Sequence, residues 1–121
     1  MGKNIETEAL CVNIIAAGTE IQGDIKTSGD MRIDGKLTGN FISEQKLVVG
    51  TSGIIEGTIT CKDCDISGKI VGNILIKELL ILKSTADING DIAANNIVME
   101  LGSQFSGVCK MHQNVFKGKK D

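Results

Sequence analysis

The chain has 121 residues, 41% of them hydrophobic, and a formal net charge of −2 at pH 7. This length predicts one domain, and the hydrophobic content excludes a disordered chain. The near-balanced charge gives no broad basic field for nucleic acid, and 3 Phe with no Trp or Tyr leave few rings for stacking on bases. We therefore expect no nucleic-acid partner.

The first eleven residues are mostly polar and are expected to form a short tail (1–11). Glu6 and Glu8 stand where a signal peptide would be apolar, and no apolar region precedes Cys11 as in a lipoprotein signal. The longest apolar run within the repeats, Leu79–Leu82, is far shorter than the roughly 20 residues of a membrane span. Four cysteines without an export signal favour reduced thiols in the cytoplasm.

From residue 12 onward, a six-residue phrase occurs six times. EIQGDI (20–25) returns as KLTGNF, IIEGTI, KIVGNI, DINGDI and QFSGVC. The residues two before and two after each Gly are apolar or Cys, whereas its immediate neighbours are mostly polar, and this period of two predicts strands with one inward face. The predicted inward columns are Ile21, Leu37, Ile55, Ile70, Ile88 and Phe105 before the Gly, and Ile25, Phe41, Ile59, Ile74, Ile92 and Cys109 after it.

Two further columns precede each Gly. Four residues before it, every coil has a small residue or Thr, as a tight corner requires: Thr19, Gly35, Gly53, Gly68, Ala86 and Ser103. Eight residues before it, an apolar residue or Cys predicts a second inward column on a different strand: Ile15, Met31, Val49, Cys64, Leu82 and Met99. The spacings between successive glycines are uneven: 16, 18, 15, 18 and 17 residues.

A unit of about 17 residues built from short strands cannot bury its own inward face, but stacked units can, at the ~4.8 Å spacing of hydrogen-bonded strands. The sequence therefore predicts an all-β parallel β-helix, or β-solenoid, of about six coils over residues 12–111. Three strands per coil fit the unit length better than two. The uneven spacing favours the right-handed form over the left-handed hexapeptide form. Short flexible tails, 1–11 and the basic 112–121, are expected to flank the domain.

The ends of such a rod expose unpaired backbone groups and an open apolar core. Neither tail has the length or apolar face of a good cap, although Val115 and Phe116 are able to cover part of one end. Another copy of the rod satisfies these ends, and because it also has a free end, growth need not stop. We therefore predict a filament, and a folded monomer when a charge is placed at Phe105. The predicted contact residues are Ile14, Ile15, Ile21, Ile97, Met99, Leu101 and Phe105.

The motif CKDC, with Cys61 and Cys64, is typical of half a zinc site or of a redox pair. A zinc site needs four ligands, and the other cysteines, Cys11 and Cys109, belong to opposite ends of the rod. Cys64 and Cys109 fall in inward columns, where Cys acts as a small hydrophobic residue. We interpret these cysteines as structural and predict no metal and no cofactor.

Catalytic chemistry has little support in the remaining residues. The only His, His112, lies just beyond the last coil and is interpreted as a solvated surface residue. Asp24, Glu56 and Asp91 occupy outward positions, where strands need polar residues for solubility. We therefore predict that the protein is not an enzyme.

The segments NIIAAGTEIQGDI, GDMRIDGKLTGN, ADINGDI and LGSQFSGVCKM, spread over about residues 13–111, resemble the bactofilins, bacterial polymer-forming cytoskeletal proteins. The resemblance implies a right-handed, three-sided β-helix that polymerises end to end without nucleotide, with like ends meeting. It also implies a scaffold that positions envelope, cell-wall or morphogenesis proteins. Phe105, within GSQFSG, matches the apolar position that supports polymer contacts in the family.

Several bactofilins carry a short hydrophobic N-terminal segment that targets the membrane. MGKNIETEAL has no such run, so we expect a cytoplasmic protein held at the inner face of the cell membrane through partners and not by direct membrane binding. The alternative function is a non-polymerising β-solenoid binding module that presents one flat strand face to a protein partner.

Overall fold

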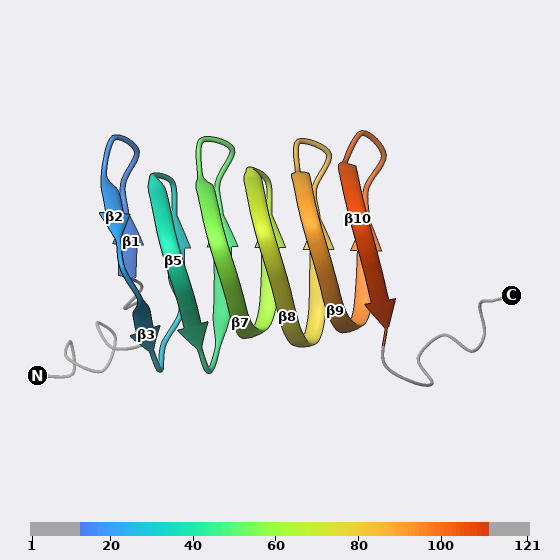
Figure 1. Cartoon of the computed structure of the whole chain (residues 1–121), viewed down its shortest axis with the longest axis horizontal. Coiled ribbons are helices and arrows are strands. Elements are labelled where there is room, and N and C mark those ends of the chain that lie inside the picture. The colour runs from blue at the N-terminus through green and yellow to red at the C-terminus, as the bar shows by residue number, and fades with distance from the viewer. Residues whose placement is uncertain (1–12, 112–121) are drawn as a thin grey trace, which may run out of the picture.

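The computed structural model describes residues 13–111, which form a single sheet of parallel strands wound into a rod (Figure 1). The predicted tails, Val12 at the expected domain boundary, and with them Cys11, His112, Val115 and Phe116 lie outside the described residues. The strands are β1 (Asn13–Ile15), β2 (Glu20–Gln22), β3 (Ile25–Thr27), β4 (Met31–Ile33), β5 (Lys36–Ser43), β6 (Lys46–Val49), β7 (Ile54–Ile66), β8 (Lys69–Leu82), β9 (Asp87–Met99) and β10 (Gln104–Met111).

Successive coils lie side by side along the rod, and its two ends carry the first and the last strands (Figure 1). The glycine-centred phrases pair in register throughout: Ile55 pairs with Ile70, Ile70 with Ile88, and Ile88 with Phe105. The first coil shows three separate strands, β1, β2 and β3, whereas later coils join these segments into long bent strands. The predicted parallel β-solenoid of about six coils is therefore confirmed.

The core is a thin column of aliphatic side chains that runs along the rod axis. Alternation of inward apolar and outward polar residues drives this burial, since each inward side chain packs on its equivalents in the coils above and below. Phe41 is the only aromatic residue among the fully buried side chains of the described range. Of the predicted core residues, Ile25 in the first coil is partly buried, and the following are at most 1% exposed: Leu37, Phe41, Ile55, Ile59, Ile70, Ile74, Ile88 and Ile92.

The second inward column differs from the prediction. Ile33 and Ile66 occupy it where Met31 and Cys64 were expected, so that Ile15, Ile33, Val49, Ile66, Leu82 and Met99 are in register. Met31 and Cys64 belong to a neighbouring inward column, together with Leu47, Leu80 and Ile97.

Corner length explains this difference. The corners before the glycine phrases span 16–19, 50–53, 83–86 and 100–103 in four coils but only 34–35 and 67–68 in the other two. Figure 1 shows the result as tall and short loops at the top of the rod. A fixed offset from the Gly therefore reaches two different columns.

The repeated Gly stands where one coil lies against the next. Gly57, Gly72 and Gly90 have φ angles of 142°, 137° and 145°, a region that residues with a β-carbon rarely adopt. A β-carbon on Gly72 would also meet the carbonyl oxygen of Gly57. The invariant Gly of the repeat thus keeps the stacking distance uniform along the rod.

Candidate functional site

The N-terminal end of the rod is formed by β1, β2 and β3. β1 pairs only with β4, and β2 and β3 pair only with β5. Within residues 13–111, nothing pairs with the outer edges of these three strands. The backbone N–H and C=O groups along these edges are a template for further strand pairing.

The C-terminal end consists of β10 and the second half of β9. β10 pairs with residues 87–94 of β9, and residues 96–99 of β9 pair only with β8. In the part of the chain that the structure describes, the outer edges of both segments are unpaired. The two ends of the rod therefore present the same kind of surface, a set of parallel strand edges surrounding an apolar core.

The core is open at both ends. Ile21 and Ile25 at the first coil, and Ile97 and Phe105 at the last, are partly buried and pack against the fully buried core. Cys109 is in register with the buried Ile92, yet it is exposed because β10 has no further coil over it. This exposed apolar cross-section is the surface that a second copy is able to cover.

The residues predicted for polymer contacts fall into two groups. Ile15, Ile21, Ile97 and Phe105 line the ends of the core, and Met99 extends the same inward column at the last coil with 45% of its surface exposed. Ile14 and Leu101 instead point outward, with exposed fractions of 61% and 95%. The structure therefore brings the first group together at the two end surfaces and leaves Ile14 and Leu101 at their rims.

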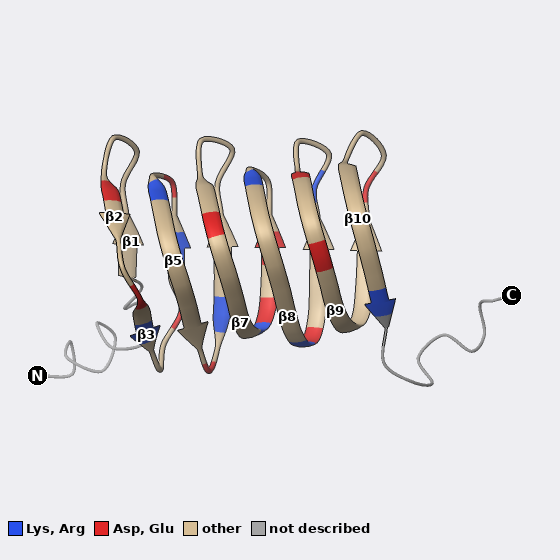
Figure 2. Cartoon of the chain, viewed as in Figure 1, with Lys and Arg blue, Asp and Glu red and all other residues tan. Residues whose placement is uncertain are grey.

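Charged residues are dispersed over the outside of the rod. Lys and Arg alternate with Asp and Glu on the face seen in Figure 2, and ion pairs such as Lys46–Asp65 (3.4 Å) join neighbouring coils at the surface. Such exposed pairs contribute at most about 1 kcal/mol each. Among the described residues, no three His, Cys, Asp or Glu side chains gather as metal ligands.

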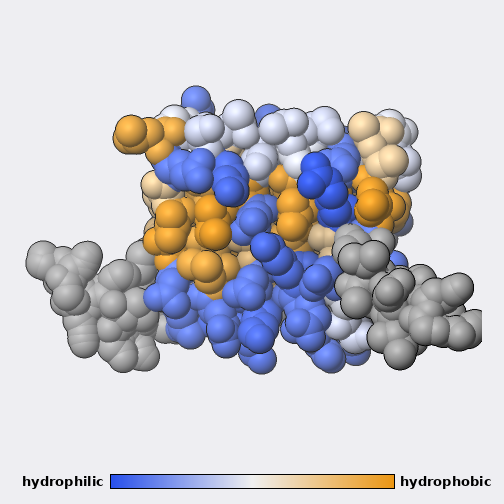
Figure 3. Space-filling view, turned by 180° about the vertical axis from the view of Figure 1, so that it is seen from behind, coloured by the Kyte–Doolittle hydropathy of each residue, from blue (hydrophilic) through white to orange (hydrophobic). Residues whose placement is uncertain are grey.

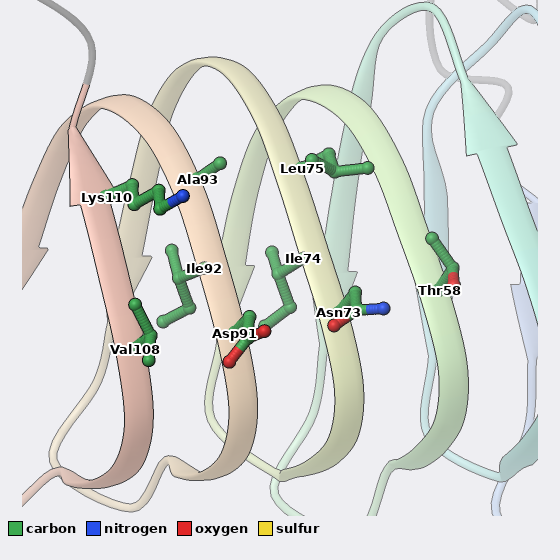
Figure 4. A pocket seen from close by; sticks show the side chains of 9 residues that line it. All are labelled: Thr58, Asn73, Ile74, Leu75, Asp91, Ile92, Ala93, Val108 and Lys110. Atoms are coloured by element: carbon green, nitrogen blue, oxygen red, sulfur yellow. The ribbon is translucent and has the colours of Figure 1, made fainter.

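A groove lies on the outer face of β7–β10, with a volume of about 320 Å³ (Figure 4). Leu75, Ala93 and Val108 give it an apolar floor, and Asp91 and Lys110 supply one charge of each sign. Thr58 and Asn73 add polar groups to its lining.

Separate apolar patches lie on the opposite face of the rod, with hydrophilic side chains between them (Figure 3). Ile14, Val48, Ile81 and Val98 belong to one outward row, which Arg32 and Asp65 interrupt. Val98 is 48% exposed. Sequence reasoning missed this row and the groove. Apolar residues at outward positions of the alternation, such as Leu75 and Val98, are the signal that would have found them.

No helix in the described range is long or apolar enough to cross a membrane.

Comparison with known proteins points to one family. A family model for bactofilins, described as polymer-forming cytoskeletal proteins, matches residues 13–110. No curated protein matches the chain.

Three solved structures are similar. The bactofilin from Thermus thermophilus in double helical filaments, seen by cryo-electron microscopy, has 28% identity and a TM-score of 0.79, over 83% of this chain and 99% of that one. The cytoskeletal bactofilin BacA, solved by solid-state NMR, has 29% identity and a TM-score of 0.77, over 85% and 98%. The crystal structure of the Thermus thermophilus protein with the mutation F105R, in that protein's own numbering, has 27% identity and a TM-score of 0.71, over 74% and 100%.

Proposed function

Because the chain belongs to the bactofilin family of polymer-forming cytoskeletal proteins, we propose that it assembles end to end into filaments without nucleotide and serves as a scaffold. The observation that carries this proposal is the open core at both ends of the rod, bordered by unpaired strand edges. Both features are covered when a second copy stacks on either end.

The energetics favour such stacking. Each end exposes several aliphatic or aromatic side chains whose equivalents in interior coils are nearly fully buried. Burial of apolar surface contributes roughly 25 cal/mol per Å². Pairing of the exposed edges adds backbone hydrogen bonds at a contact from which water is excluded. Both ends of one copy offer these contacts to a further copy, so association does not stop at a dimer.

Like ends are proposed to meet, which gives filaments without polarity. The bactofilin resemblance supports this arrangement, as it supports the role of Phe105 in the contact. On the same basis, we propose that the filament positions envelope, cell-wall or morphogenesis proteins. The filament would then lie in the cytoplasm at the inner face of the cell membrane, held there through those partners.

The alternative is a binding module that does not polymerise and presents a flat strand face to a protein partner. The groove on β7–β10, with its apolar floor of Leu75, Ala93 and Val108, favours this function. A filament is also able to use this face, because end-to-end stacking leaves it uncovered.

Negative-stain electron microscopy of the full chain at physiological salt, without nucleotide, tests the proposal. Filaments whose length far exceeds one rod are expected. Monodisperse particles at high protein concentration would contradict polymerisation and support the binding module.

A further inference from the structure

Two thiols share one corner of the solenoid. Cys61 ends one inward segment of β7 and Cys64 begins the next, and the register of β7 and β8 shifts between Cys61 and Asp63. Lys62 between them is exposed, whereas Cys61 and Cys64 are 2% and 0% exposed. The corner therefore turns both sulfur atoms into the same part of the core.

The two thiols lie at the same corner, in buried and hydrogen-bonded surroundings. The Cys61 S–H donates a hydrogen bond to the carbonyl oxygen of Asp63, with 3.2 Å between the heavy atoms. Burial and a hydrogen bond with Cys61 raise the pKa of Cys64 well above its ordinary value. Both side chains point into the core on either side of the exposed Lys62, so the two thiols lie at the same turn of the rod.

Packing alone does not require sulfur at this corner. The equivalents of Cys61 in the following coils are Ile76 and Ala94, and those of Cys64 are Leu80 and Ile97. Each of these coils fills the corner with aliphatic side chains. The coil of β7 places two adjacent thiols at the same positions.

One of the thiols borders a surface groove, although only 2% of the residue is exposed. A surface groove of about 340 Å³ runs along this corner, and Cys61 is among its lining residues, with Lys62, Lys77, Glu44 and Glu78 around it. Cys64 does not line this groove. A small reagent in this groove therefore meets Cys61 before Cys64.

We propose that Cys61 and Cys64 form a reversible intramolecular disulfide, with a low-molecular-weight disulfide such as glutathione disulfide as the oxidant. The Cys61 thiolate attacks one sulfur of the reagent, whose S–S bond breaks and releases one glutathione thiolate, which takes up a proton. The Cys64 thiol then gives its proton to solvent and attacks the Cys61 sulfur, displacing the second glutathione thiolate. Two protein thiols lose two electrons, and glutathione disulfide is reduced to two glutathione molecules.

Peptide mapping of the folded full chain tests this proposal, because trypsin cuts after Lys62 and separates the two cysteines. After oxidation by glutathione disulfide, acid quench and alkylation under denaturing conditions, fragments 47–62 and 63–69 are expected to be joined by a disulfide. A reductant is expected to release them. Changing Cys11 and Cys109 to Ser beforehand removes the other two thiols of the chain, and a non-reducing gel shows that the disulfide lies within one chain.

Single variants check the order of the steps. Cys64→Ser is expected to stop at a mixed disulfide between Cys61 and glutathione, whereas Cys61→Ser is expected to slow modification of Cys64 at least about tenfold, because Cys64 is out of reach. Circular dichroism shows whether each variant is folded. The proposal is overturned if the unmutated pair links only in denaturant, if only glutathione adducts form, or if Cys64 of folded Cys61→Ser reacts as fast as before.

Discussion

Phe105 lies directly over Ile88 in the register of β10 on β9, and it stays partly buried whereas Ile88 is completely buried. The difference arises because Ile88 has a coil on both sides and Phe105 has one. Phe105→Arg is therefore expected to abolish filaments while the fold is kept, because an unpaired charge at a stacked apolar surface is strongly unfavourable. Electron microscopy and circular dichroism measure the two properties. Ser106→Arg is the matched control, since Ser106 is exposed on the outer face, and its filaments should remain.

The oligomer formed by variants with one end blocked shows whether like ends or opposite ends of the rod stack in the filament. Phe105→Arg blocks the C-terminal end, and Ile21→Arg, at a partly buried position of the first coil, blocks the other. Filaments built from like ends are expected to leave dimers with either single variant and monomers with both changes. Analytical ultracentrifugation distinguishes these states. Monomers with each single variant, the outcome first expected from the sequence for Phe105, would instead show head-to-tail stacking.

Gly72→Ala is expected to cost about 3 kcal/mol or more of unfolding free energy, since it forces Ala into a left-handed backbone conformation and a β-carbon onto the carbonyl oxygen of Gly57. Urea unfolding of the doubly blocked chain, followed by circular dichroism, measures the loss. Gly29→Ala is the control, because no heavy atom lies within 4 Å of the added β-carbon. Equal stability of the two variants would show that the glycine stack is not constrained.

Ser43 is the one buried polar side chain in the described range, 5% exposed, and its hydroxyl is fully used. It donates to the carbonyl oxygen of Gly29 at 2.9 Å and accepts from the N–H of Gln45 at 3.0 Å. Ser43→Ala leaves both backbone groups without this partner and is expected to lower the unfolding free energy by about 1–3 kcal/mol. Ser52→Ala removes an exposed hydroxyl that donates to the backbone carbonyl oxygen of Asp34 at 2.8 Å, and its smaller loss of unfolding free energy in the same urea titration serves as the reference.

Stability should fall in alkaline solution. Burial, with the hydrogen bond to Cys61, raises the pKa of Cys64 above its ordinary value of 9.0, so the folded chain keeps a proton that the unfolded chain loses. The stabilisation is complete below pH 9.0 and is lost as the pH rises toward the folded pKa, with a slope of up to about 1.4 kcal/mol per pH unit.

The Cys64→Ala variant isolates this effect. Its unfolding free energy, measured by urea titration with reductant present, is expected to depend less on pH between about 8.5 and 9.5, where most lysines remain protonated. The chain contains no Tyr that would titrate there. Identical pH profiles for the variant and the parent would contradict the assigned role of Cys64.

The repeat made most of the core predictable. Each inward residue two positions from a Gly has an equivalent in the next coil, so Ile55, Ile70 and Ile88 were identified from the phrase alone and lie in register. The second inward column was harder to predict from the sequence. The corners before the Gly have two lengths, so a fixed count back from the Gly selects Met31 where Ile33 occupies the column.

The end surfaces were predictable only in outline. The alternation places Phe105 and Ile15 inward, but it gives no warning that Leu101 lies in a protruding corner. A search for inward apolar columns also does not identify outward apolar residues such as Leu75. Their grouping into a groove depends on the coil stacking, which a single phrase does not contain.

Uniform stacking has a consequence for subunit size. Every interior coil presents equivalent inward side chains to the coils above and below, as Ile55, Ile70 and Ile88 do. Duplicating one interior repeat would lengthen the rod by one strand spacing, ~4.8 Å, and leave both termini chemically unchanged. The number of interior repeats thus sets the length of the subunit in fixed increments. Evolution or design can change that number without altering the surfaces through which subunits join.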